Sequence, residues 1–482
     1  MTRPRLMLDD CDHLPYLYMP SETLSKLHEL ALDVLEKTGI HAPEPETLTM
    51  AQEAGFDVSS AEQRIRFSPE LVAKYLSHTP NHFLIAGREP KDDLELGMDS
   101  LFTRPQSGCP NVLDIDTGVC RPALQSDIAA MAKLNDMLPN LHLAASLIYP
   151  NDVHVQDRDV ATLASLVKNT RKHIYIQPYE AEGAARMAEM AEVLRGGSKE
   201  AALRPPFTLI TGPTSPLVIA PNELAIMRLA ARKGMPFTFG STPIRGATGP
   251  VTLAGEVVLH HAEGLAGIVL TQTFRPGAPI SYAIRPSGMD MRTASPIWGG
   301  AEWGIVSAAL VQLARRCGLI TDVVGMPTDS KALDVQSGLE KGFNAAFAAL
   351  FGSNIVAGAG YIDFIMTGSF EQLVIDNDIA GMMLRVRQGI EVDDDRLASQ
   401  LIQEIGPAGN YLTDPHTLRY MRTETFTPAV LNRQTRTSWV LDGEKDAVQV
   451  ARQRAKELIS AHNTPPLPED VSAELDRIAL QH

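Results

Sequence analysis

Short apolar runs alternate with longer amphipathic stretches from residue 141 onward. The runs begin near residues 141, 172, 206, 235, 266, 279, 318 and 354, and most are separated by a stretch long enough for a helix. Near-continuous apolar strands that alternate with helices indicate a parallel sheet covered on both faces. These eight units predict an α/β fold with a closed (β/α)8 TIM barrel over residues 126–380. The run at 266 is joined to the next by a short loop, so this unit is irregular and the strand count is open by one.

The pattern before the barrel predicts an N-terminal α+β cap over residues 1–125. Apolar positions at helical spacing predict a helix over 21–39 with Ser21 as its N-cap, and a second short helix follows at 68–78. Strand-like residues on both sides of an Asp-Thr-Gly turn predict a β-hairpin over 112–123. We expect Ser126 to cap the first helix of the barrel region.

The pattern after the barrel turns helical and predicts a C-terminal helical extension over residues 381–482. Helical stretches are expected near 380–390, 395–406 and 443–460. A Pro-rich, linker-like stretch at 462–471 then precedes a last short helix.

The charge and the N-terminal residues narrow the class of partner. A net charge of −15 disfavours nucleic acid and anionic membrane surfaces, because both require a basic protein face. The first 20 residues lack an apolar signal core, and no apolar stretch has the length that a spanning helix needs. Four scattered cysteines form no C-x-x-C pair, so neither a disulfide framework nor a metal site is predicted. We therefore expect a cytoplasmic protein.

Residues that follow the apolar runs are the candidates for function, because a barrel of this kind places its active site at the carboxyl ends of the strands. The candidate catalytic residues are Asp329 and Lys331. The candidate substrate-binding residues are Tyr149, Gln177, Thr214, Gln272, Tyr361 and Phe364. Amides, hydroxyls and aromatic rings of this kind position a ligand, while the difficult chemistry can come from a cofactor that a partner supplies.

A dinucleotide site is disfavoured at the glycines of the last apolar run. Gly358 and Gly360 begin a G-x-G-x-x-G pattern, but Asp363 occupies the position of the third glycine. A carboxylate there would oppose a phosphate. The better interpretation is the carboxyl end of a buried strand, where glycines allow a close approach of ligand or backbone.

Five segments carry a resemblance to a known family. They are residues 21–40, LITGPTSPL (209–217), DSKALDVQSGLEKG (329–342), GSNIVAGAGYIDF (352–364) and SFEQLVIDNDIAGMMLRVRQGIEV (369–392). Together they resemble the trimethylamine methyltransferase (MttB-like) family over about residues 20–440. The resemblance implies a TIM barrel that moves a methyl group from a methylated amine to the Co(I) corrinoid of a separate carrier protein.

The chain departs from the archaeal trimethylamine enzymes, which carry pyrrolysine at the barrel mouth, since it contains only standard residues. The departure implies the branch that resembles glycine betaine methyltransferases and acts on quaternary amines. For such a substrate we expect Tyr149, Tyr361 and Phe364 to hold the cation, since an aromatic face attracts an ammonium group. Gln177, Thr214, Gln272 and Lys331 are the candidate donors to a substrate carboxylate.

The corrinoid is expected on a partner protein. The nearest match to a cobalamin-binding D-x-H-x-x-G motif begins at Asp414 and His416, but Arg419 stands where glycine is required. We expect a cognate corrinoid protein as a transient partner, with a homodimer through the C-terminal helices as a further possibility. Two alternatives stay open: an unrelated barrel lyase or hydrolase that uses Asp329, Glu340 or Asp363 as acid and base, and a cytoplasmic betaine-binding sensor.

Overall fold

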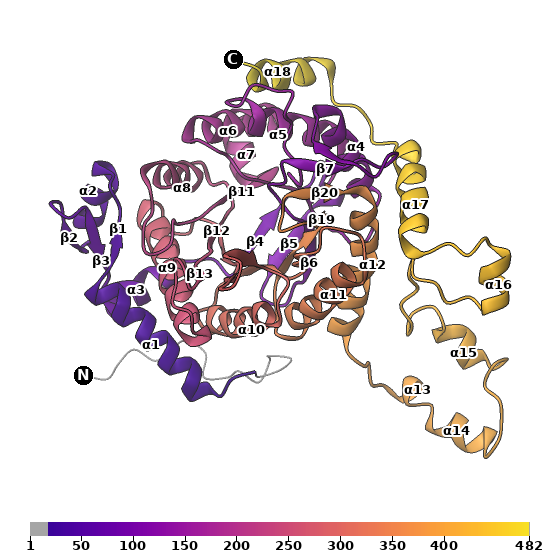
Figure 1. The fold of residues 1–482 in the computed structure, drawn as a ribbon. Coiled ribbons are helices and arrows are strands. Elements are labelled where there is room, and N and C mark those ends of the chain that lie inside the picture. The colour runs from indigo at the N-terminus through magenta and orange to yellow at the C-terminus, as the bar shows by residue number, and fades with distance from the viewer. Residues whose placement is uncertain (1–17, 482) are drawn as a thin grey trace.

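A barrel of eight parallel strands forms the centre of the computed structural model, which describes residues 18–481 (Figure 1). The N-terminal segment that lacks a signal core, and Cys11 within it, lie outside the described residues. The strands, in the order in which they neighbour one another, are β6 (Phe102–Pro105), β18 (Ile355–Ala359), β17 (Thr321–Val324), β14 (Ile280–Ile284), β12 (Phe237–Ser241), β11 (Phe207–Thr211), β10 (Ile174–Ile176) and β9 (Ala144–Ala145). The backbone N–H of Leu143 donates to the carbonyl of Thr103 at 3.1 Å, so the two ends of the sheet meet and the predicted barrel is confirmed.

Eight helices surround the barrel. They are α4 (Gln125–Asp136), α5 (Arg158–Asn169), α6 (Ala181–Arg195), α8 (Pro221–Lys233), α9 (Leu253–Phe274), α10 (Ala301–Arg316), α11 (Val335–Leu350) and α12 (Phe370–Gln388). A short helix, α7 (Ser198–Leu203), follows α6. Each strand therefore has a helix on its outer side, as the alternating pattern predicts.

The amino end of the barrel is closed by a hairpin of β4 (His82–Ile85) and β5 (Leu94–Gly97), with η2 (Pro90–Asp92) at its turn. Ile85 and Leu96 from this hairpin pack against Tyr175, Ile210 and Ile355 of the strands. Because side chains alternate along a strand, these contacts identify which strand residues face the barrel interior. The loops at the carboxyl ends lie at the other end.

The predicted strand over 266–274 is wrong, because these residues complete helix α9. A short apolar run cannot be told from a buried helix by periodicity alone. Two glycines let α9 lie close to the sheet: a Cβ on Gly264 would come within 2.4 Å of Tyr282, and one on Gly267 within 2.2 Å of Phe239. The expectation that no apolar stretch has the length of a spanning helix is wrong, because α9 is long and apolar enough. Since 78% of its apolar window is buried in the protein, it is a core helix.

The eighth strand is β6, which the apolar pattern did not reveal and which lies inside the segment 1–125 expected to form the cap. Its sequence, FTRP, contains a charged residue and a proline, so it does not have the apolar pattern of the other strands. The Arg104 guanidinium is only 2% exposed and pairs with Asp322 at 2.8 Å, so tertiary contacts make the strand possible. The three-part division of the chain stays a prediction.

The N-terminal elements largely follow the sequence predictions. Helix α1 (Ser21–Lys37) packs along α9, and β1 (Ile40–His41), β2 (Asp57–Ser59), β3 (Arg64–Arg66), α2 (Pro45–Glu53) and α3 (Pro69–Leu76) form a small layer beside it (Figure 1). The predicted hairpin is confirmed as β7 (Asn111–Leu113) paired with β8 (Cys120–Pro122). Strand β20 (Thr367–Ser369) pairs with β7 and with β19 (Tyr361–Ile362).

Two predicted helix caps are wrong. The N-cap of α1 is Pro20, and the Ser21 hydroxyl instead accepts from Arg316 on α10. Helix α4 begins after Leu124, which is its N-cap. The Leu124 N–H donates to the Asp127 side chain, so the N-cap is not Ser126. In each case a longer-range or reciprocal partner replaced the local hydroxyl that the sequence suggested.

The C-terminal helices divide into a packed pair and an extended arm. Helices α17 (Ala447–Ala461) and α18 (Glu469–Ala479) pack on the outer helices of the barrel, α17 against α12 and α18 against α6. Between α12 and α17 the arm, residues 389–446, carries α13 (Asp394–Leu397), α14 (Ser399–Ile405), α15 (Pro415–Tyr420) and α16 (Arg436–Leu441), and it stands away from the barrel (Figure 1). The single helix expected near 395–406 is interrupted at Ala398, which has a φ of +49°.

Candidate active site at the carboxyl ends of the strands

The loops after β16 (Ser295–Ile297), β17 and β18 meet at one side of the barrel mouth. The carboxylate of Asp329 accepts the backbone N–H of Trp298 at 2.9 Å and that of Gly299 at 2.9 Å. The backbone N–H of Asp363 donates to the carbonyl of Ser330 at 2.6 Å. Three loops that are distant in sequence are therefore held together around Asp329.

An aromatic group lies at this junction. The ring of Trp298 contacts Phe364 edge-on, with centroids 4.8 Å apart, and Tyr361 at 6.4 Å. On its other side it lies 4.9 Å from Trp303. Phe364 and Tyr361 were predicted from the sequence, but Trp298 was not, because it follows a short strand, β16, that the apolar pattern does not reveal.

Three consecutive residues of the lip after β18 have left-handed backbone conformations. The φ angles of Asp363, Phe364 and Ile365 are +54°, +52° and +57°. Such a conformation costs an L-residue about 1–2 kcal/mol each, and strained backbone of this kind clusters at functional sites. The hydrogen bond from Phe364 N–H to the Thr328 carbonyl, at 3.3 Å, helps to hold the turn.

The glycines before this lip serve close packing. Gly358 and Gly360 have φ angles of +112° and +88°. A Cβ on Gly358 would approach the backbone of Met326 to 3.0 Å, and one on Gly360 would approach Leu147 to 2.7 Å. The sequence interpretation of a strand end with close backbone approach is confirmed.

A fully buried ion pair between two outer helices contacts the end of β18, where one of these loops begins. Lys341 on α11 contacts Asp376 on α12 at 2.9 Å, and both side chains are 0% exposed. The ammonium also donates to the Gly358 carbonyl at 2.9 Å and lies 4.5 Å from the centre of the Tyr361 ring. One face of Tyr361 is therefore already occupied by a cation of the protein itself.

The acidic residues at the mouth are engaged in structural hydrogen bonds. Burial and the nearby Glu340 carboxylate raise the pKa of Asp329. Glu340 accepts from the Thr328 hydroxyl at 2.6 Å and from the Asp329 N–H at 2.9 Å. The Lys331 side chain is 74% exposed, donates to the Asp329 carbonyl and lies 3.9 Å from Asp363. Both carboxylates therefore organise the loop, and Lys331 lies on its outer rim.

Tyr149 and Gln177 form a second group after β9 and β10. The Tyr149 hydroxyl donates to the backbone carbonyl of Gln177 at 2.9 Å and lies 3.0 Å from the Ser146 hydroxyl. Its ring packs 4.9 Å from that of Tyr179. The Gln177 side chain is exposed and follows the inward-facing Tyr175 by two positions, so it faces the mouth.

Thr214 and Gln272 do not join these groups. Thr214 is exposed on the loop after β11, where its backbone pairs with Val218. Gln272 is fully buried near the end of α9, donating to the Ala278 carbonyl and accepting from the Gly277 N–H. Residues 275–279 lead into β14, so Gln272 lies at the amino end of the barrel, and its predicted place after a strand is wrong.

The structure brings together three possible metal ligands that are remote in sequence. His28, His261 and Cys317 have ligand atoms within 4.8 Å of one another. The two imidazoles are already hydrogen bonded at 2.9 Å, and the second nitrogen of His261 lies 3.2 Å from the Tyr282 hydroxyl. Burial lowers the pKa of His28 to about 4, so it is neutral at pH 7. This network joins α1 to α9 and β14.

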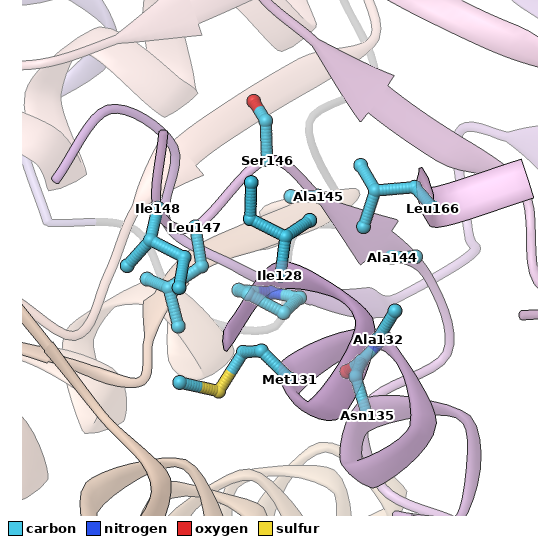
Figure 2. Close-up of a pocket in the computed structure, with 11 residues that line it drawn as sticks. Ile128, Met131, Ala132, Asn135, Ala144, Ala145, Ser146, Leu147, Ile148 and Leu166 are labelled. Carbon is cyan, nitrogen blue, oxygen red and sulfur yellow. The ribbon is translucent and has the colours of Figure 1, made fainter. Parts of the chain in front are cut away.

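A small cavity lies in the barrel wall between α4 and β9 (Figure 2). Its volume is about 10 Å³, and its lining is mostly apolar, with Ile128, Met131 and Leu147 among the residues. One water molecule needs about this volume. Asn135 lines the cavity, and its Oδ1 is buried without a partner in the described residues, so the cavity suits a single water rather than a substrate.

The partial cobalamin motif has structural roles in the arm. Asp414 caps α15 by accepting the N–H of His416 at 2.8 Å, and Arg419 pairs with Asp395. The residue that would have to be glycine thus carries a side chain used in an ion pair.

The chain is similar to proteins of one family over nearly its full length. The family model described as trimethylamine methyltransferase (MTTB) matches residues 11–480. The chain is 31% identical to the trimethylamine methyltransferase MttB of Desulfitobacterium hafniense (strain DSM 10664 / DCB-2), over 95% of this chain and 92% of the relative. It is 29% identical to the glycine betaine methyltransferase of Desulfitobacterium hafniense (strain Y51), over 97% of each chain.

A solved structure supports the fold. The monomethylamine methyltransferase of Methanosarcina barkeri (MtmB) matches with a TM-score of 0.51 at 9% identity, covering 92% of this chain and 93% of that one. At this identity the likeness shows the barrel fold alone. The family match and the 31% identity show more: the chain belongs to the trimethylamine methyltransferase (MTTB) family of corrinoid-dependent methyltransferases.

Proposed function

We propose that this enzyme transfers a methyl group from a betaine-type quaternary amine, such as glycine betaine, to the Co(I) corrinoid of a separate cytoplasmic carrier protein. The observation that carries the proposal is the aromatic group of Trp298 and Phe364 held beside the Asp329 carboxylate at the barrel mouth. Aromatic faces and a nearby negative charge attract a cation that cannot donate hydrogen bonds.

A quaternary substrate suits a site without an evident acid catalyst. The Co(I) centre of the carrier would supply the nucleophile, and the nitrogen already bears the positive charge that makes a neutral tertiary amine its leaving group. The chain's own residues then bind and orient the substrate and exclude water. Both Asp329 oxygens accept from backbone N–H groups, so this carboxylate positions Trp298.

The predicted site residues divide into distinct proposed roles. Phe364, with Trp298, contacts the methylated nitrogen, and Asp329 positions Trp298 and attracts the cation. Tyr361 supports the ring of Trp298, because one of its faces is turned to Lys341. Tyr149 and Gln177, after β9 and β10, form another part of the wall of the mouth. Lys331 and Thr214 lie at the rim, and Gln272 has no role in this proposal because it lies at the other end of the barrel.

The corrinoid protein is proposed to dock over α11. Val335 and Leu339 lie on one face of this helix, are 85% and 69% exposed, and follow directly after the Asp329 loop. We propose that the partner covers this helix when it brings a cobalt ion to the mouth. A Leu339→Glu variant should lose methyl transfer to the carrier protein but keep transfer to free cob(I)alamin. Equal losses with both acceptors would contradict this docking surface.

The arm is proposed to join two copies of the chain. Within the described residues, its four helices bury no residue, and Leu412, Leu418 and Leu441 are 73%, 64% and 81% exposed. Helices this short have no core of their own, so a second surface must cover them. Sedimentation equilibrium should give a dimer, and a Leu412→Glu, Leu418→Glu, Leu441→Glu variant should give a monomer. A monomeric wild type would contradict the proposal.

The function is tested directly with the purified enzyme under anaerobic conditions. Chemically reduced cob(I)alamin is mixed with a panel of quaternary amines, with trimethylamine as the comparison, and the Co(I) absorbance is followed. Conversion to methylcobalamin with a betaine, and none with trimethylamine, supports the proposal. Conversion with trimethylamine alone would overturn it, as would no conversion with any quaternary amine when the cognate corrinoid protein is present.

A further inference from the structure

We infer that Arg285, at the carboxyl end of β14, binds the carboxylate of the substrate and so selects carboxylated quaternary amines. The inference rests on the proposed function and deepens it. It replaces the amide, hydroxyl and lysine donors that the sequence suggested with a guanidinium that the fold places inside the barrel.

The direction of the Arg285 side chain follows from the strand. Tyr282 lies against Gly264 of the outer helix α9, and Ile284 is on the same side of β14, so the alternating residues Ala283 and Arg285 face the barrel interior. A Cβ on Gly240 of the neighbouring strand β12 would come within 2.6 Å of an Arg285 Nη atom. The Arg285 guanidinium therefore lies against Gly240. Because glycine has no side chain, the guanidinium has room in the barrel interior.

The charges near this side chain do not balance. Arg104 pairs with Asp322 at 2.8 Å, and Arg245 at the mouth pairs with Glu256 at 2.5 Å. No carboxylate of residues 18–481 lies within salt-bridge distance of Arg285, and its guanidinium has no hydrogen-bond acceptor among them. Asp322, the carboxylate whose field acts on Arg285, is already held by Arg104. One positive charge in the barrel thus lacks a partner.

Arg285 keeps that charge at neutral pH. Burial lowers the pKa of Arg285 to about 10, which is still far above 7. An unpaired charge in a partly buried position is costly unless an anion meets it. Arginine matches a carboxylate with two parallel hydrogen bonds, so a small carboxylate is the chemical class that fits.

A second polar group without a partner lies close to Arg285 in the sequence. The Ser287 hydroxyl, two residues further along the chain, is 1% exposed and has no hydrogen-bond partner in the described residues. A buried hydroxyl of this kind requires an explanation, and a ligand oxygen would provide its acceptor.

Ser287, two residues after Arg285, lies near the proposed cation site. Gly288 in β15 (Ser287–Asp290) pairs with Ile297 in β16, so Ser287 and Trp298 occupy adjoining ends of these two strands. Paired strands are about 5 Å apart. A carboxylate on Arg285 and an ammonium group on Trp298 would therefore suit a compact zwitterion, in which only a short linker separates the two charges.

The experiment compares ligands that share the ammonium group and differ in the carboxylate. Dissociation constants for glycine betaine and for choline are measured by calorimetry without corrinoid, and methyl transfer to cob(I)alamin is measured in parallel. The wild type should bind glycine betaine roughly 10- to 100-fold more tightly than choline, as expected for a charge-assisted pair. Equal binding of the two ligands would overturn the inference while leaving methyl transfer from a quaternary amine intact.

Two variants sharpen the test. Arg285→Gln should lose the preference for glycine betaine and keep the affinity for choline, and Arg285→Lys should retain an intermediate preference. An Arg232→Gln variant, altered on the surface of α8, serves as the control and should match the wild type. If Arg285→Gln still prefers glycine betaine, Arg285 is not the anchor. If the wild type transfers a methyl group from no quaternary amine even with the cognate corrinoid protein present, the proposed function itself fails.

Discussion

The carboxylate of Asp329 accepts the backbone N–H of Trp298 with both oxygens, at 2.9 and 3.0 Å. This contact ties the loop after β17 to the aromatic residue that the sequence did not predict. In an Asp329→Asn variant one oxygen becomes an NH2 group that cannot accept, so the loop should loosen.

We expect Asp329→Asn to lower kcat/KM for methyl transfer at least tenfold and to shift tryptophan emission to longer wavelength. Hydrogen bonds to a charged group contribute about 1.5–3 kcal/mol to stability. The unfolding free energy of Asp329→Asn should fall by less than this amount, because the amide oxygen can still accept. Glu302→Gln, an exposed carboxylate at the start of α10, is the control and should change neither quantity. An unchanged emission spectrum in Asp329→Asn would contradict the positioning role.

Removing one member of the buried Lys341–Asp376 ion pair should cost more stability than removing both. Lys341→Met leaves Asp376 unpaired in the core and should cost about 3–5 kcal/mol. The double variant Lys341→Met, Asp376→Asn removes both charges and should be more stable than the single variant. Urea unfolding of the wild type and the variants measures the difference. A double variant less stable than Lys341→Met would contradict this account.

Substitutions at Asp363, in the turn after β18, should differ in stability according to how readily each residue adopts a left-handed backbone conformation. Asp363 has a φ of +54°, which glycine adopts without cost and a β-branched residue adopts poorly. Asp363→Gly should therefore unfold at the wild-type temperature or above it. Asp363→Val should be less stable by about 1–3 kcal/mol, by thermal unfolding. Equal stability of the Gly and Val variants would show that the turn is not strained.

Acid should destabilise the protein through its buried histidines. Burial lowers the pKa of His28 and of His173 to about 4, while an unfolded histidine titrates near 6.5. Between these values the unfolded chain binds more protons, so the unfolding free energy falls as the pH is lowered from 6.5 toward 4. Each unit of lowered pKa contributes about 1.4 kcal/mol.

Urea unfolding at pH 7, 6 and 5 measures this slope. His28 contacts His261 and Cys317 and lies near Glu29 and Arg316, so its protonation would break the joint between α1 and α9. His28→Gln should flatten the slope between pH 6 and pH 5. His82→Gln, on the exposed side of β4, should leave the slope unchanged. A His28→Gln slope equal to that of the wild type would contradict the assignment.

Seven of the eight barrel strands could be predicted because each is a continuous apolar run bounded by turn residues. The eighth could not, because β6 contains Arg104, whose burial depends on Asp322 more than 200 residues away. The error at 266–274 has a different cause: here an apolar run belongs to a buried helix. Helix α9 is buried on nearly all sides, and only the neighbouring Tyr282 and Phe239 explain why glycines on a helix, rather than a strand, fit there.

The candidate site divides in the same way. By itself, the sequence determined that the chain alternates strands and helices, that the residues after the apolar runs are the candidates for function, and that its motifs resemble one methyltransferase family. Only the tertiary structure decided that Trp298 joins Phe364, that Gln272 lies at the far end, and that Arg285 lacks a counter-charge. The physical reason is that periodicity and motifs are local, whereas pairing, orientation and charge balance depend on partners that folding brings together from distant parts of the chain.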